Sequence, residues 1–149
     1  MALVKNVIDP TPGSPRFLRY ERILYRIGRY GSRVGIALAA KQLPEVFDNV
    51  IDSGLFHVFS DDDSRRYVEG LATVLKPGGR LFFLCFSDEE PETQGPRRVS
   101  RKEIEVLFAE GWEVESIEPS RYEVRPDLKD LGFGEGGPRA WFVVVRRAG

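Results

Sequence analysis

His57 is the single histidine among the 149 residues, and it follows closely after the turn-forming residues 52–54. An imidazole changes its charge near neutral pH, so His57 is a candidate general base that takes a proton from a reacting group. The competing interpretation is a histidine packed between Phe56 and Phe59 with one satisfied ring nitrogen. The same segment therefore allows a catalytic and a purely structural role.

Other reactive side chains are scarce. Cys85 is the single cysteine and lies in the apolar run 81–86, which predicts a buried and inert thiol. One cysteine excludes an internal disulfide, and with one histidine it cannot build a clustered metal site. The sequence also lacks a nucleophile elbow, a P-loop and a zinc-knuckle pattern. We therefore expect no metal site.

The candidate residues lie in a predicted strand–helix–strand unit, residues 47–87. Residues 49–51 form the first strand, and the apolar run 81–86 forms a second strand that is buried on both faces. Between them, residues 60–75 have helical apolar spacing and a capping-box-like start, and residues 76–79 (KPGG) stop the helix. Two strands linked in this way run parallel.

A polar loop, residues 88–99, follows this unit. It lies at the carboxyl end of a predicted parallel strand, where open α/β sheets bind ligands. Arg97 and Arg98 in this loop are candidates for contact with an anionic substrate. Equally, they are solvated or balance the acidic residues 88–90.

The C-terminal part alternates between helix and strand signals. Ser100 and Glu103 form a capping box that opens a helix. Residues 112–117 alternate as in a strand, residues 125–138 form a glycine-rich loop, and residues 140–145 form a final strand.

The N-terminal segment is basic, because residues 1–46 hold eight Lys and Arg against three acidic residues. Residues 16–30 predict an amphipathic helix, and the apolar run 34–40 predicts a strand, with a short helix as the competitor. The arginines either form a docking surface for phosphate, nucleic acid or an acidic partner, or are an ordinary solvated face. The helix carries an apolar stripe (Phe17, Tyr20, Leu24, Ile27) and an arginine stripe (Arg19, Arg22, Arg26, Arg29).

The stretch FDNVIDSGLFHVF, followed by LATVLKPGGRLFFLCFSD, resembles the second half of a class I S-adenosylmethionine (SAM)-dependent methyltransferase. The resemblance runs from Phe47 to the C-terminus. It implies an α/β, Rossmann-like, mainly parallel sheet with a C-terminal antiparallel strand. It also implies SAM as the cofactor.

The resemblance assigns roles to individual residues. It places Asp52, Ser53 and Gly54 in the turn that contacts the methionine part of SAM, with Phe56 as a further cofactor-binding residue. It makes His57 the general base that takes a proton from the nucleophile during methyl transfer. A purely structural interpretation of the turn remains open, since Asp and Ser cap turns and Gly permits the bend.

No G-x-G-x-x-G-like cofactor loop precedes residue 47, and 46 residues are too few for three strands and two helices. The sequence therefore predicts an N-terminally shortened fold. We expect a single domain over residues 1–149, with an atypical basic segment (1–46) and a family-like core (47–149).

We expect the protein to be a SAM-dependent methyltransferase that acts on a small molecule, or a shortened relative of such an enzyme. The alternative is a non-catalytic remnant that self-associates, for example as a homodimer, or binds a partner through its sheet edge and basic N-terminal helix. Nucleic-acid binding is a weaker third expectation. Without a membrane-length apolar run or a secretory pattern, the expected location is the cytoplasm.

Overall fold

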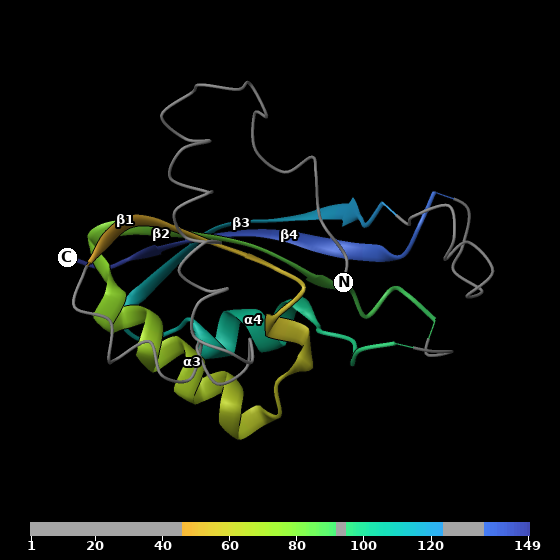
Figure 1. Ribbon diagram of the computed structural model, residues 1–149, viewed down its shortest axis with the longest axis horizontal. Helices are drawn as coiled ribbons and strands as arrows, with labels where there is room; N and C mark the ends of the chain where they lie inside the picture. Colours follow the sequence, from red (N-terminus) through yellow and green to blue (C-terminus); the bar gives the residue numbers. More distant parts are fainter. Residues whose placement is uncertain (1–45, 92–94, 124–135) are drawn as a thin grey trace, which may run out of the picture.

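The computed structural model describes residues 46–91, 95–123 and 136–149 (Figure 1). The predicted helix at 16–30, the predicted strand at 34–40 and most of the predicted loop at 125–138 lie outside these residues. The division of the chain at residue 46 therefore stays a prediction.

The predicted strand–helix–strand unit is confirmed. Strand β1 (Phe47–Ser53) is followed by the short 3-10 helix η2 (Phe56–Val58), helix α3 (Asp61–Val74) and strand β2 (Leu75–Phe86). β1 and β2 pair in parallel. The side chain of Ser60 caps α3 by accepting a hydrogen bond of 3.2 Å from the backbone N–H of Asp63, as the sequence predicted.

The KPGG segment was predicted to separate the helix from the strand, and this is wrong in detail. β2 begins at Leu75, and residues 76–79 form an irregularity within the strand, because Phe47 pairs with Leu75 while Asn49 pairs with Arg80. Gly79 fits this bulge since a Cβ atom there would lie 2.8 Å from the Lys76 carbonyl oxygen. The segment thus ends the helix and bends the strand at once.

The described strands form one sheet of order β1-β2-β4-β3. β4 (Arg139–Arg147) is antiparallel to both of its neighbours, so β3 (Trp112–Arg121) runs in the same direction as β1 and β2. The predicted mainly parallel sheet with an antiparallel C-terminal strand is therefore confirmed. β3 is longer than the predicted 112–117, and a register shift between Val114 and Ser116 lets both Val114 and Ile117 pack against the core.

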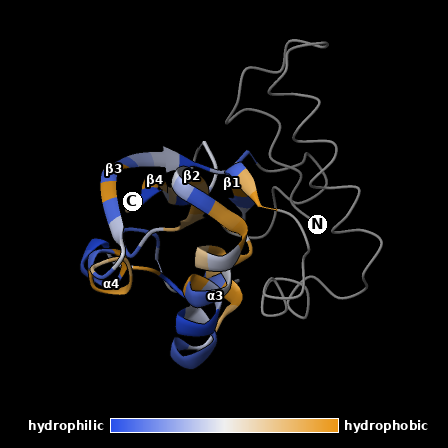
Figure 2. Ribbon diagram, turned by 90° about the vertical axis from the view of Figure 1, so that its left-hand side faces the viewer, coloured by the Kyte–Doolittle hydropathy of each residue, from blue (hydrophilic) through white to orange (hydrophobic). Residues whose placement is uncertain are grey.

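Helices α3 and α4 (Arg101–Leu107) lie on the same side of the sheet (Figures 1 and 2). Ser100 caps α4 by accepting a hydrogen bond from the Glu103 N–H at 3.1 Å. The main core fills the space between these helices and the sheet, and its burial from water supplies the main favourable term in folding. Its largest fully buried side chains include Trp141, Phe56, Phe59, Phe83, Phe108 and Leu81. Among the described residues, no helix is both long and apolar enough to span a bilayer.

Candidate functional site

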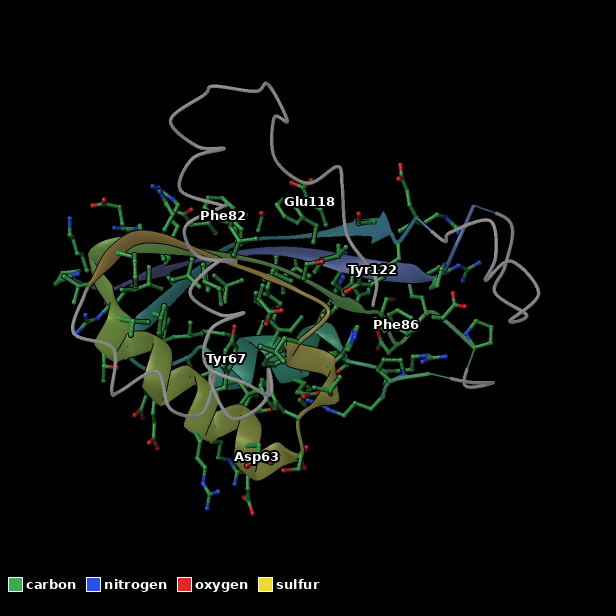
Figure 3. All side chains as sticks on the ribbon, in the orientation of Figure 1. Asp63, Tyr67, Phe82, Phe86, Glu118 and Tyr122 are labelled. Carbon is green, nitrogen blue, oxygen red and sulfur yellow. The ribbon has the colours of Figure 1, made fainter. Side chains whose placement is uncertain are left out.

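The segment after β1 turns back across the carboxyl ends of β1 and β2, which is where open α/β sheets bind ligands. The N–H of Gly54 donates to the Leu84 carbonyl at 3.0 Å, so the turn stays attached to β2 after the ladder ends. Gly54 has φ of 80°, a conformation that favours glycine. Phe86 and Tyr122 reach the same end of the sheet from β2 and from the residue after β3 (Figure 3). Their ring centroids are 5.2 Å apart.

Asp52 is buried, and its carboxylate faces the helices. One oxygen accepts the Leu55 N–H at 2.9 Å, and the other accepts the Tyr67 hydroxyl at 2.9 Å. Burial raises the pKa of Asp52 from 3.8 to about 6, although these hydrogen bonds partly oppose the rise. Asp52 therefore shapes the turn and ties it to α3.

Ser53 has the opposite orientation, because successive side chains of a strand point to opposite faces. Its hydroxyl oxygen is buried and has no hydrogen-bond partner within the part of the chain that the structure describes. A buried hydroxyl without a partner costs free energy, so such groups in a native fold commonly mark a ligand or an ordered water. Ser53 is the predicted site residue whose polar group remains available.

His57 is 4% exposed. Its Nδ1 accepts a hydrogen bond of 2.9 Å from the Phe86 N–H, and its ring lies beside the backbone of Gly54. Burial, followed by the charges of Arg97 and Arg98, lowers the pKa of His57 from 6.5 to about 4. The imidazole is thus neutral at physiological pH, and its general-base role stays a prediction.

The structural alternative for His57 is partly right. The ring is buried, but it contacts the rings of Phe86 and Tyr122, at centroid distances of 4.9 and 5.9 Å, rather than lying between Phe56 and Phe59. Phe56 is fully buried on the helix side of the sheet, 5.1 Å from the Phe83 ring centroid. The structure therefore brings Ser53, Gly54 and His57 together and places Phe56 in the core.

Tyr122 is a site residue that the sequence analysis missed. Its hydroxyl donates to the Leu84 carbonyl at 2.5 Å, the same oxygen that accepts the Gly54 N–H. The hydroxyl also lies 3.6 Å from where a Cβ atom of Gly54 would stand. The predicted strand 112–117 ends five residues before Tyr122, and the partner is 38 residues away, so no clear signal in the sequence pointed to this residue.

Arg97 and Arg98 are both engaged with groups of the fold, and contact with an anionic substrate stays a prediction. Arg97 donates to the Phe59 carbonyl at 2.7 Å and to the Ser64 hydroxyl at 3.2 Å, and its guanidinium lies 2.7 Å from a Glu103 carboxylate oxygen. Arg98 donates to the Glu90 backbone carbonyl at 3.0 Å. Both guanidinium groups organise the loop that leads into α4, since each is engaged with groups of the fold.

Comparison with known proteins gives this geometry a context. The family described as thiopurine S-methyltransferase matches residues 34–135. The 2-heptyl-1-hydroxyquinolin-4(1H)-one methyltransferase of Mycobacteroides abscessus is 30% identical over 93 residues, which are 61% of this chain and 39% of that protein. The chain thus spans about two fifths of the length of this relative.

Solved structures share the fold. One, described by its role in converting a disulfide bond into a thioacetal group during echinomycin biosynthesis, has a TM-score of 0.60 and 28% identity, over 90% of this chain and 63% of that chain. The N-methyltransferase NodS of Bradyrhizobium japonicum, in complex with S-adenosyl-L-homocysteine, has a TM-score of 0.52 and 15% identity, over 89% and 62% of the two chains. TehB of Haemophilus influenzae has a TM-score of 0.54 and 12% identity, over 91% and 48%.

Proposed function

The chain belongs to the thiopurine S-methyltransferase family and has the fold of class I SAM-dependent methyltransferases, and from this premise we propose that it transfers a methyl group from SAM to a small-molecule acceptor. The family match includes the whole segment from β1 to α4 that carries the candidate site. The comparisons give no support to the non-catalytic alternative.

The unpaired buried hydroxyl of Ser53 is the observation that carries this proposal. It lies at the carboxyl end of β1, next to a glycine whose backbone adopts φ of 80°. Ser53 and Gly54 would hold the methionine part of the cofactor, and Asp52 would fix the turn that presents them. SAM supplies the activated methyl group, and the residues around it have mainly to position the reactants.

A small-molecule acceptor is supported by the name of the Mycobacteroides relative, which acts on a hydroxyquinolone. We take a hydroxyquinolone as the first acceptor to assay. The homodimer and the cytoplasmic location expected from the sequence remain part of the proposal.

The direct test is calorimetric titration of the purified protein with S-adenosylhomocysteine, with the mass determined by light scattering on the same sample. We expect saturable binding of one ligand per chain. A folded protein that gives no heat at millimolar ligand would overturn the proposal. The mass decides between a monomer and the proposed homodimer.

Two serine variants locate the binding. Ser53→Ala removes the unpaired hydroxyl, so we expect a loss of affinity of about tenfold, as for one hydrogen bond to a charged group. Ser116→Ala is the matched control, because Ser116 is on β3 at the far side of the described sheet from β1. Equal affinity of the two variants would remove Ser53 from the site.

A further inference from the structure

We infer that His57 is a positioning residue, whose neutral imidazole holds the Ser53–Gly54 turn against the end of β2, and not the proton acceptor of the reaction. The catalytic consequence of this inference rests on the proposed function. The contacts from which it is argued do not depend on that function.

The imidazole takes the place of a strand partner at the end of β2. The parallel ladder between β1 and β2 ends at the pair Ser53 and Leu84. Two residues further on, the N–H of Phe86 has no β1 residue opposite it and donates to His57 Nδ1 at 2.9 Å. The carbonyl of Phe86 accepts the Val99 N–H at 2.9 Å. Because buried backbone groups must be paired, His57 supplies the hydrogen-bond partner that β1 does not provide for the N–H of Phe86.

The second ring nitrogen faces the turn. Nε2 of His57 lies 3.6 Å from the position that a Cβ atom on Gly54 would occupy. A neutral imidazole has one donor and one acceptor nitrogen, so accepting at Nδ1 makes Nε2 the donor. One side chain therefore joins the glycine of the turn to the last residue of β2.

The contact with Phe86 needs the neutral form of the ring. Nδ1 can accept from Phe86 only without a proton, and a proton acceptor in catalysis needs that same lone pair. The charges of Arg97 and Arg98, on the loop before α4, disfavour a positive imidazole, and the neighbouring Tyr122 hydroxyl is a neutral donor. The contact with Phe86 and the charges of Arg97 and Arg98 together keep the His57 ring neutral, with Nδ1 as a hydrogen-bond acceptor.

The decisive experiment compares His57→Asn with His57→Phe, using S-adenosylhomocysteine affinity and turnover as separate readouts. The side-chain oxygen of asparagine can accept from the Phe86 N–H in place of Nδ1, but an amide does not titrate. We expect His57→Phe, which loses both contacts, to lose about tenfold or more in affinity, and His57→Asn, which keeps the contact with Phe86 and loses the one with Gly54, to lose clearly less affinity and to retain turnover. A general base would give the opposite result, with affinity kept and turnover abolished in both variants.

An NMR measurement of the unmodified protein tests the same inference without any ligand. We expect the ¹⁵N shifts of His57 to report a neutral ring protonated at Nε2, unchanged from pH 5.5 to 8, and the Phe86 amide proton to exchange slowly. A ring that titrates near 6.5, the ordinary value for histidine, would overturn the inference. If the protein bound no S-adenosylhomocysteine, the proposed function would fail, while this measurement would still decide the role of His57.

Discussion

The hydroxyl of Tyr67 donates a hydrogen bond of 2.9 Å to the carboxylate of Asp52, and this contact joins the middle of α3 to the end of β1. Both groups are buried. The other carboxylate oxygen accepts the Leu55 N–H, so the bond from Tyr67 reaches through Asp52 to the backbone of the turn. Figure 3 shows Tyr67 on the face of α3 that is turned to the sheet. The helix is thereby part of the scaffold of the candidate site.

Tyr67→Phe should destabilise the protein by about 1–3 kcal/mol, because it leaves a buried carboxylate oxygen of Asp52 without its side-chain donor. Urea denaturation at pH 7 measures the free energy of unfolding. Tyr122→Phe is the matched control, since Leu84 keeps the Gly54 N–H as a donor when the Tyr122 hydroxyl is removed. A loss at Tyr67 no larger than the loss at Tyr122 would contradict this account.

Asp52 and His57 should affect the pH dependence of stability in opposite directions. The pKa of Asp52 rises to about 6 on folding, so the folded state binds more protons than the unfolded state between pH 4 and 6, and the contribution of Asp52 falls as pH rises there. The pKa of His57 falls to about 4, so the unfolded state binds more protons between pH 4 and 6.5, and the contribution of His57 rises with pH. In the unmodified protein the two effects largely cancel.

Single variants separate the two effects. Relative to the unmodified protein, Asp52→Asn should gain stability as pH rises from 4 to 6, and His57→Asn should gain as pH falls from 6.5 to 4. Each change has an upper limit of roughly 3 kcal/mol. Urea denaturation at four pH values across this window provides the measurement. If the stability difference between a variant and the unmodified protein stays constant with pH, the pKa of the replaced residue is not shifted by folding.

Gly79→Ala should be far more harmful than Gly78→Ala. A Cβ atom on Gly79 would lie 2.8 and 2.9 Å from the carbonyl oxygens of Lys76 and Asp48, so the backbone bulge would have to move. Gly78 has φ of 77° with open space around its Cβ position, and alanine there costs about 1 kcal/mol of backbone strain. Thermal melting of the two variants compares them, and equal melting temperatures would contradict the described bulge.

Arg97→Met should lower stability without a specific effect on ligand binding. The guanidinium supplies donors to the Phe59 carbonyl and to the Ser64 hydroxyl, and loss of such bonds costs about 1.5–3 kcal/mol. Arg66→Met is the control, because Arg66 forms an exposed ion pair with Asp63 that contributes at most about 1 kcal/mol. An Arg97 variant of unchanged stability that fails to bind its acceptor would restore the substrate-contact interpretation.

Local patterns in the sequence were sufficient to predict the helices and strands themselves. Ser60 and Ser100 begin α3 and α4 because a hydroxyl can accept the N–H three residues later, which is a contact within one turn. The apolar run 81–86 predicted a strand buried on both faces, since only an interior strand needs no polar face. The boundaries were less accurate where tertiary pairing extended β2 back to Leu75 and β3 on to Arg121.

The sequence by itself determined the strand–helix–strand unit, the helix caps and the turn with Ser53 and Gly54, because each depends on residues close together in the chain. Only the tertiary structure decided what these residues contact. His57 meets the Phe86 N–H across 29 residues, and the Tyr122 hydroxyl meets the Leu84 carbonyl across 38. No spacing rule specifies such contacts, since they depend on which strand lies beside which and on where each strand ends. For this reason the sequence could present His57 only as a candidate base, whereas the fold shows its ring as a buried hydrogen-bond acceptor.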